Sequence, residues 1–299
     1  MYSKSAPNLN SDLNANKNRP KGFSHARGQG YDMDDIRVAA VIFNSPLGEV
    51  ENNLDRMESH ILHARHSDVS LICFPEMAVT GYCSDERIKN VALEDADGVI
   101  LRLQDLAERE KITILTGLAE KDTQGNIYAS HFVFIPGKNP EKYRKIHVAP
   151  PEQTIFSPGN TIPIFKTQGF CFGIQLCYDA HFPFLSTRMA EKGVDAIFMP
   201  HASPRGTSRE KFNSWMRHIT ARSYDNGVFV IACNQCGKNK NGLSFPGLAF
   251  VTDPSGEILA KDISGNEGIL LADLKKDALD HVRDHRMRYF LPNTRRDLV

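Results

Sequence analysis

The amino-acid sequence predicts an α/β fold, in which short apolar strands alternate with amphipathic helices. Two apolar runs of strand length, residues 38–43 and 71–74, enclose a segment at residues 50–61 whose apolar side chains recur at helical spacing. The chain of 299 residues is 41% hydrophobic, which supplies a substantial core. This β-α-β beginning indicates apolar sheets covered by helices, with the chemistry placed in loops at the strand ends.

The same alternation continues along the chain without a linker or an internal repeat. Residues 122–126 have the composition of a hairpin turn, and the apolar residues that follow favour a strand. We predict, in order, a helix at residues 99–111, a strand at 112–117, a strand at 129–135, a strand ending at 177, a helix through 189, a strand at 196–199, a long helix at 209–225, and strands at 228–233 and 248–252.

Charge and hydropathy exclude several classes of protein. Lys+Arg and Asp+Glu each number 36, so the sequence has no net positive charge to attract nucleic acid or an anionic membrane. The longest apolar runs, such as residues 38–43 and 227–233, are far shorter than the roughly 20 residues that span a bilayer. Residues 1–35 are rich in Asn, Ser and Lys and lack the apolar stretch of a secretory signal, which predicts a flexible N-terminal arm and a cytoplasmic protein.

The cysteines and histidines give no pattern typical of a metal site. The 6 cysteines lie mostly inside apolar runs, which favours reduced and buried thiols over a disulfide framework. Cys233 and Cys236 form a C-x-x-C, but no second pair lies at zinc-finger spacing and no redox context surrounds it. The histidines on predicted helices fit solvated helix faces better than ligand sets: they are His60, His63, His66, His281 and His285.

Three segments place a reactive side chain just after an apolar strand, and these side chains are Glu76, Lys145 and Cys177. Pro75 ends the first strand and delivers Glu76 at its carboxyl edge. Taken singly, each residue has an ordinary structural interpretation: a strand-end carboxylate, a solvated lysine and a buried cysteine. The argument therefore depends on their combination.

Cys177 carries the strongest physical argument of the three. The sequence around it predicts a sharp turn from a strand into a helix, beside the positive end of the helix dipole. We expect this position to lower the thiol pKa from its free value of about 8.5 and to favour the nucleophilic thiolate. Backbone N–H groups in such a turn can also hold an oxyanion.

In combination and in this order, the three segments resemble the signature blocks of the nitrilase superfamily. The blocks are Phe-Pro-Glu with Thr-Gly-Tyr behind it, Tyr-Arg-Lys-x-His, and Leu-Cys-Tyr-Asp-x-x-Phe-Pro. The resemblance extends over residues 37–275, and supporting matches lie at residues 126–130, 156–159, 221–226 and 232–234.

The resemblance implies a four-layer α-β-β-α sandwich whose active site joins Glu76, Lys145 and Cys177. In this interpretation Cys177 is the nucleophile, Glu76 transfers protons, and Lys145 with the backbone N–H of Tyr178 stabilises the oxyanion. Glu152 is similar to the family's second glutamate, which orients the lysine. No cofactor or metal is implied. The resemblance also implies a homodimer or larger homo-oligomer.

The predicted organisation has three parts. Residues 1–35 form the flexible arm, residues 36–274 form the carbon–nitrogen hydrolase domain, and residues 275–299 form a C-terminal extension that packs at an oligomer interface. The extension is highly charged before it ends in Tyr-Phe-Leu-Pro, which favours packing on a neighbouring surface.

The substrate class follows from the residues after the nucleophile. True nitrilases usually carry Trp-Glu there, whereas this chain has Tyr178-Asp179, the pattern of the amidase and carbamoyl-amide branches. We therefore expect a small linear amide as substrate, with an N-carbamoyl compound as the alternative, and a nitrile or a catalytically silent scaffold behind both. Arg205 is a candidate clamp for a substrate carboxylate. The candidate pocket residues are Tyr82, His181, His201, Ser203, Arg205, Trp215 and Asn234.

Overall fold

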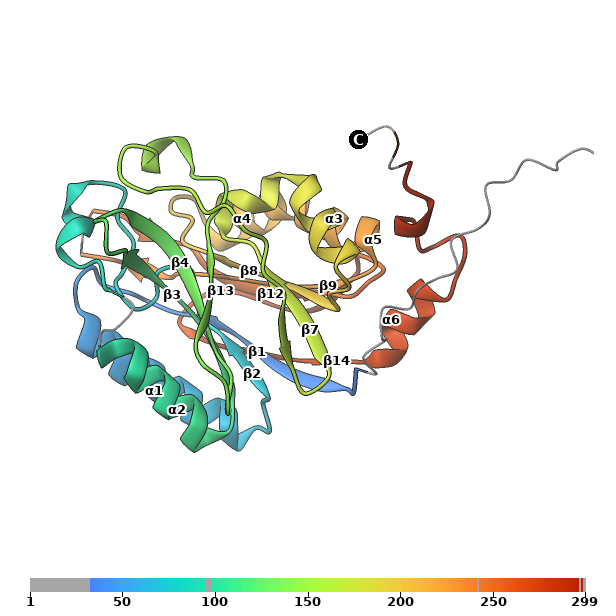
Figure 1. The fold of residues 1–299 in the computed structure, drawn as a ribbon, viewed down its shortest axis with the longest axis horizontal. Helices are drawn as coiled ribbons and strands as arrows, with labels where there is room; N and C mark the ends of the chain where they lie inside the picture. Colours follow the sequence, from blue (N-terminus) through green and yellow to red (C-terminus); the bar gives the residue numbers. More distant parts are fainter. Residues whose placement is uncertain (1–32, 95–97, 241, 296, 298–299) are drawn as a thin grey trace, which may run out of the picture. The chain divides into compact units, whose positions relative to one another are not determined.

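Two six-stranded sheets, each covered by helices, form the layers of this protein (Figure 1). The computed structural model describes residues 33–94, 98–240, 242–295 and 297. The predicted N-terminal arm, residues 1–35, therefore lies almost wholly outside the described residues. Within the part of the chain described, no helix is both long enough and apolar enough to cross a membrane.

The first sheet has the strand order β14-β1-β2-β3-β4-β5. Strands β1, β2 and β3 run parallel, β14 pairs antiparallel with β1, and β4 pairs antiparallel with β3 and with β5, so β5 runs in the direction of β1–β3. Its outer face is covered by α1 (Val50–His66) and α2 (Gly98–Glu110). Its strands are β1 (Ile36–Ile42), β2 (Leu71–Cys73), β3 (Thr113–Lys121), β4 (Ile127–Phe134), β5 (Glu141–Arg144) and β14 (Gly268–Leu274).

Strand β1 shows why the chain forms layers. Because successive side chains of a strand point to opposite faces, a continuous apolar run can be buried on both. Ala39 and Val41 pack with the residues of α1 and α2, whereas Ala40 and Ile42 pack toward the second sheet. The apolar run therefore places β1 in the middle of the sandwich.

The second sheet has the strand order β13-β12-β9-β8-β7-β6, and β7, β8 and β9 are parallel. Helices α3 (Pro183–Glu191), α4 (Ser208–Trp215) and α5 (Ile219–Asn226) pack on its outer side (Figure 1). Its strands are β6 (Phe165–Thr167), β7 (Phe170–Ile174), β8 (Ala196–His201), β9 (Phe229–Asn234), β12 (Gly247–Thr252) and β13 (Ile258–Gly265). A small hairpin, β10 (Gly237–Lys238) and β11 (Ser244–Phe245), lies outside both sheets.

The predicted α/β class, the four-layer sandwich and the hairpin turn are confirmed, but the long helix at residues 209–225 is wrong. The chain breaks after Trp215, where His218 N–H donates to Trp215 O (3.1 Å) and helical bonding restarts at Ile219. The break lets the Trp215 ring stack on His201, with ring centroids 3.9 Å apart. Tertiary packing thus overrides a continuous helical pattern. The sequence prediction also omitted β13 and β14, the last strands of the two sheets.

The C-terminal segment packs on its own chain. Helix α6 (Lys276–Arg283) buries Leu279 and Val282, and Arg283 forms an ion pair with Asp195 (2.9 Å). Beyond it, the Phe290 ring contacts the Tyr224 ring of α5, with centroids 5.3 Å apart. These contacts tie the segment to the second sheet and its helices, and a role at an oligomer interface stays a prediction.

Candidate active site

The candidate site lies where strand ends of the two sheets meet. Glu76 follows β2 of the first sheet, and Cys177 follows β7 of the second. Lys145 directly follows β5, and the loop after β8 brings the backbone of Ala202 to Glu76. Because the carboxyl ends of parallel strands open into a crevice, such an edge is where ligands bind in α/β sheets. The structure thus brings together the three residues that the sequence singles out.

Glu76, Lys145 and Glu152 form a buried charged cluster. The Lys145 ammonium donates to Glu76 Oε1 (2.9 Å) and to Glu152 Oε2 (2.8 Å). All three side chains are at most 3% exposed. Charges at this depth are expensive to bury unless they are paired and hydrogen-bonded, as they are here. An ammonium held between two carboxylates has little positional freedom.

The two carboxylates keep Lys145 protonated. Burial alone would lower the pKa of this lysine, but the negative charges of Glu76 and Glu152 outweigh it and raise its pKa above the usual value. Lys145 is therefore a fixed positive charge at neutral pH, suited to stabilising an oxyanion and not to carrying protons.

Burial raises the pKa of Glu76, and the charge of Glu152 adds to the effect. The Lys145 ammonium and the backbone N–H of Ala202, which donates to Glu76 Oε2 (2.9 Å), act in the opposite direction. A carboxylate with a raised pKa is a stronger base than a solvated one, which suits general acid–base catalysis.

Cys177 departs from the expectation that its turn would favour the thiolate. Burial, followed by the negative charge of Glu76, raises the pKa of the Cys177 thiol above its ordinary value. The segment that follows is a short 3₁₀ turn, Cys177–His181, and α3 begins only at Pro183, so no long helix dipole points at the sulfur. The thiol therefore needs a base to remove its proton.

The backbone at the cysteine is strained. Cys177 has φ 45°, in the left-handed region that side chains other than glycine rarely adopt. Such outliers persist where the surrounding structure fixes them, and they cluster at functional sites. The turn holds the half-buried Cys177 near Glu76 and Lys145, whose charges act on the thiol.

Two glycines allow the backbone to approach the charged cluster. A Cβ on Gly117 of β3 would lie 2.4 Å from Met77 N, next to Glu76. A Cβ on Gly159 would lie 2.3 Å from Arg144 O, next to Lys145. Side chains at either position would displace the backbone that carries a charged residue.

Asp179 is a positioning residue that the sequence analysis did not identify. This buried carboxylate accepts from the Tyr143 hydroxyl (2.7 Å) and the backbone N–H groups of His147 (2.8 Å) and Leu176 (3.1 Å). It also lies 2.8 Å from His147 Nδ1. Asp179 therefore joins the segment that carries Lys145 to the turn that carries the cysteine. The sequence signal was present, because these partners belong to the Tyr-Arg-Lys-x-His and Leu-Cys-Tyr-Asp blocks.

The pocket residues near the cluster have different surroundings. The Tyr82 hydroxyl donates to Glu152 Oε1 (2.7 Å), so this tyrosine helps hold the second glutamate. His201 is buried with Nδ1 2.7 Å from Met199 O, and burial keeps its pKa far below the usual value, so the ring is neutral. His181 is exposed and stacks on His218, with ring centroids 4.3 Å apart.

The loop after β8 carries Ser203 and Arg205, and Asn234, the last residue of β9, binds this loop. Asn234 accepts from Ser203 N (2.9 Å) and donates to Ser203 O (3.1 Å) and Pro246 O (3.0 Å). Its polar side-chain atoms are thus all engaged with backbone, and it holds the loop. Arg205 is exposed on that loop and has φ 71°. Ser203 Oγ accepts from Lys211 (3.0 Å), a residue of α4 that the sequence analysis did not single out.

Two of the residues that could have suggested a redox or metal site have other partners. Cys233 Sγ contacts Cys73 O (3.8 Å), and His60 pairs with Glu267 (3.1 Å). Among the described residues, no group of three or more His, Cys, Asp or Glu side chains is arranged to hold a metal ion.

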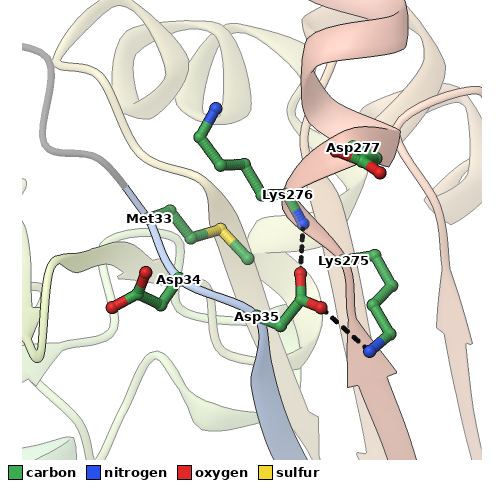
Figure 2. A pocket seen from close by; sticks show the side chains of 6 residues that line it. All are labelled: Met33, Asp34, Asp35, Lys275, Lys276 and Asp277. Atoms are coloured by element: carbon green, nitrogen blue, oxygen red, sulfur yellow. Dashed lines mark hydrogen bonds and ion pairs between the residues drawn. The ribbon is translucent and has the colours of Figure 1, made fainter.

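A pocket lies at the start of β1, where Met33, Asp34 and Asp35 line it together with Lys275, Lys276 and Asp277 (Figure 2). There Asp35, just before β1, accepts from Lys275 Nζ (2.9 Å) and from Lys276 N (3.0 Å). None of the residues lining it is a predicted site residue. Its exposed ion pair joins the start of β1 to the region of α6 and offers no catalytic group.

Comparison with known proteins identifies the class. The sequence profile described as carbon-nitrogen hydrolase matches residues 37–284. An (R)-stereoselective amidase of Pseudomonas sp is 29% identical over 71% of this chain and 75% of its own length. The omega-amidase NIT3 of Saccharomyces cerevisiae is 28% identical over 83% of this chain and 90% of its own length.

The structural comparison agrees. The crystal structure of Saccharomyces cerevisiae Nit3, a member of branch 10 of the nitrilase superfamily, superposes with a TM-score of 0.76 and 26% identity. The match covers 86% of this chain and 97% of that chain. The chain belongs to the carbon-nitrogen hydrolase family. The resemblance to the nitrilase superfamily, drawn from the sequence blocks, is thereby confirmed.

Proposed function

We propose that this protein hydrolyses the C–N bond of a small linear amide through a thioester on Cys177, releasing ammonia. The observation that carries the proposal is the Lys145 ammonium held between Glu76 and Glu152, whose charges act on the Cys177 thiol. A nucleophile, a base and a fixed positive charge are the groups that acyl transfer needs without a metal.

In the first half of the reaction, Glu76 accepts the proton of the Cys177 thiol as the sulfur attacks the amide carbon. The raised pKa of the thiol makes this base necessary, because the thiolate is scarce at neutral pH. When the C–N bond breaks, Glu76 returns the proton to the departing nitrogen. Ammonia leaves, and the acyl group stays on the sulfur.

In the second half, a water molecule attacks the thioester carbon while Glu76 accepts one of its protons. The C–S bond then breaks, the proton returns to the sulfur, and the carboxylic acid product leaves. Glu76 thus alternates between base and acid, and no oxidant, reductant or metal takes part.

The surrounding groups stabilise or position the reacting atoms. Lys145 and the backbone N–H of Tyr178 stabilise the oxyanion of both tetrahedral intermediates. Glu152 positions Lys145, and Asp179 positions the segments that carry Lys145 and Cys177. From the geometry we assign Asn234 to holding the β8 loop rather than to binding substrate.

Amides rank first among the substrates because relatives named amidases cover most of this chain. An N-carbamoyl compound is the second candidate, supported by the N-carbamoylputrescine amidase of Oryza sativa subsp. japonica, 25% identical over 83% of this chain. Tyr178-Asp179 after the nucleophile argues against a nitrile.

Ammonia release tests the proposal directly. The purified protein is incubated with butyramide, N-carbamoylputrescine and butyronitrile, with Cys177→Ala as the control for contaminating activity. We expect ammonia from butyramide in the wild type and none in the variant. Ammonia from the carbamoyl compound alone would replace the amidase with the carbamoyl alternative, and none from any compound would favour a silent scaffold.

We further propose that the protein acts without metal or organic cofactor, in the cytoplasm, as a homodimer or larger homo-oligomer with residues 275–299 at the interface. The charged side chains of the cluster fill the roles that a metal would supply elsewhere. Dialysis against EDTA should leave ammonia release unchanged, and restoration by Zn²⁺ after a loss would overturn this expectation. Sedimentation of the full chain and of a chain ending at 274 tests the interface.

A further inference from the structure

Lys211 brings a second ammonium toward the candidate active site. This residue of α4 donates from Nζ to Ser203 Oγ (3.0 Å) and to Pro204 O (3.0 Å). The residue before this pair, Ala202, donates from its backbone to Glu76 (2.9 Å). The loop after β8 therefore connects Lys211 to the base of the proposed reaction within three consecutive residues.

The ammonium of Lys211 has no carboxylate partner among the described residues. Burial lowers the pKa of Lys211, and Cys177, when ionised, acts against burial. The sulfur is thus close enough to affect this lysine electrostatically, whereas Glu76 and Glu152 are already paired with Lys145.

Lys211 has a hydrogen-bond donor available for a ligand. An ammonium has three N–H donors, of which two have partners here. A partly buried cation without a counter-ion is costly to retain for structure alone, because a neutral donor could hold the same two oxygens. The nearby His201 ring is neutral and offers no negative charge to balance it.

We propose that Lys211 is the specificity-determining residue that binds a carboxylate at the far end of a linear amide substrate. This inference rests on the proposed amide hydrolysis and names the substrate class, an ω-amide that carries a carboxylate. The cleaved amide group lies at Cys177, and the carboxylate supplies the counter-ion that Lys211 lacks among the described residues. A lysine serves here as a compact point charge on a flexible stem.

Two amides of equal length test the proposal. Succinamate and butyramide share the amide and the carbon spacing, but a carboxylate in the first replaces a methyl in the second. We compare the ratio of their kcat/KM values in the wild type, Lys211→Met and Lys211→Arg. Lys275→Met is the matched control, because it removes an exposed lysine that lines the pocket at the start of β1 (Figure 2).

We expect the wild type to prefer succinamate and Lys211→Met to lower that preference by about 10–100-fold, through KM for succinamate, as loss of one charge-assisted contact does. Lys211→Arg should retain most of the preference, and Lys275→Met should match the wild type. Lys211→Gln replaces the Met variant if the latter does not fold.

An unchanged preference in Lys211→Met would overturn the proposal, as would an equal loss for both amides, since that pattern marks a residue that only holds the loop. Loss of preference in Arg205→Met instead would assign the carboxylate to Arg205. If the proposed function itself is wrong, the result differs, because neither amide then releases ammonia. Calorimetric binding of succinamate to Cys177→Ala, with and without Lys211→Met, still decides the role of Lys211 in that case.

Discussion

The charged cluster and the pocket rim are built in opposite ways. Glu76, Lys145 and Glu152 are buried and bound to one another, and each has partners from a distant part of the chain. The predicted rim residues are exposed: His181 ends the 3₁₀ turn after Cys177, and Arg205 lies in the loop after β8. The cluster is therefore rigid in position and charge, whereas the rim can change without disturbing the fold.

This difference separates the reaction from its specificity. In the proposed reaction, the cluster determines the chemistry, because its geometry depends on strand ends of both sheets. The proposed role of the rim is to select the acyl group that reaches the cysteine, and Lys211 contacts Ser203 of the loop after β8. Substitutions in the cluster should lower kcat, and substitutions in the rim should change KM.

The largest expected effect is the loss of the nucleophile. Cys177→Ala should abolish ammonia release while leaving the thermal unfolding transition close to that of the wild type, because the side chain is small and half-buried. Cys171→Ala is the matched control and should retain activity, because Cys171 lies in β7, before the turn that carries Cys177. Wild-type activity in Cys177→Ala would exclude the thioester route.

Lys145→Met should lower kcat by roughly 100–1,000-fold, the effect of losing one oxyanion-stabilising group. Methionine keeps much of the length but removes the charge that Glu76 and Glu152 surround. Lys142→Met is the control. Lys142 lies in β5, just before Lys145, and pairs with Glu120 (2.7 Å), so its loss should affect stability rather than kcat. A rise in KM alone for Lys145→Met would instead make this lysine a substrate-binding residue.

The sequence indicated most of the charged cluster and little of the contacts around the pocket rim, for physical reasons. Glu76 and Cys177 follow apolar strands, which local strand periodicity marks, whereas the strand before Lys145 is the polar β5 (Glu141–Arg144), so the expectation of an apolar strand there is wrong. Trp215, the last residue of α4 before the break, stacks on His201 of β8, and the helical pattern of residues 209–225 does not contain this contact. Lys211 belongs to no motif, since its significance comes from partners that only the folded chain supplies.

Asp179→Asn tests whether the two catalytic segments are held by one carboxylate. Both carboxylate oxygens accept hydrogen bonds, so an amide nitrogen in place of one of them would face donors and leave them unpaired. We expect kcat to fall by about 100-fold, as misplacement of reacting groups does. Asp195→Asn is the matched control, because this buried carboxylate binds Cys171 N (3.0 Å) and Arg283 (2.9 Å) instead of the site. An equal loss of kcat in both variants would mean that general destabilisation is responsible.

The pH profile tests the electrostatics of the cluster. Glu76 must be ionised to accept a proton, and its pKa is raised by burial, so kcat/KM should fall on the acid side at a pH above the ordinary range of glutamate titration. Glu152→Gln removes a charge that raises the pKa of Glu76 and should shift this limb to lower pH. Because the pKa of Lys145 is raised, no loss of activity assignable to it should occur below about pH 9. A basic limb below that pH that disappears in Lys145→Met would contradict the fixed charge.

The smallest expected effect concerns the C-x-x-C, whose cysteines flank Asn234 and Gln235; Gln235 donates to Glu76 O (2.8 Å), but neither thiol has a role in the proposed reaction. Cys233 contacts the backbone of Cys73, whereas Cys236 packs near Gly247, where an added Cβ would lie 2.7 Å from the Cys236 Cβ. Burial raises the pKa of Cys236 to about 12, so its thiol stays protonated and unreactive.

Cys236→Ser should lower the free energy of unfolding by about 1–3 kcal/mol, because a hydroxyl is more costly to bury than a thiol. The variant should leave kcat/KM for butyramide as in the wild type, and denaturant unfolding beside an ammonia assay separates the two effects. Loss of turnover in a fully folded Cys236→Ser protein would show that this thiol contributes to the reaction and that the catalytic groups extend beyond the charged cluster and Cys177.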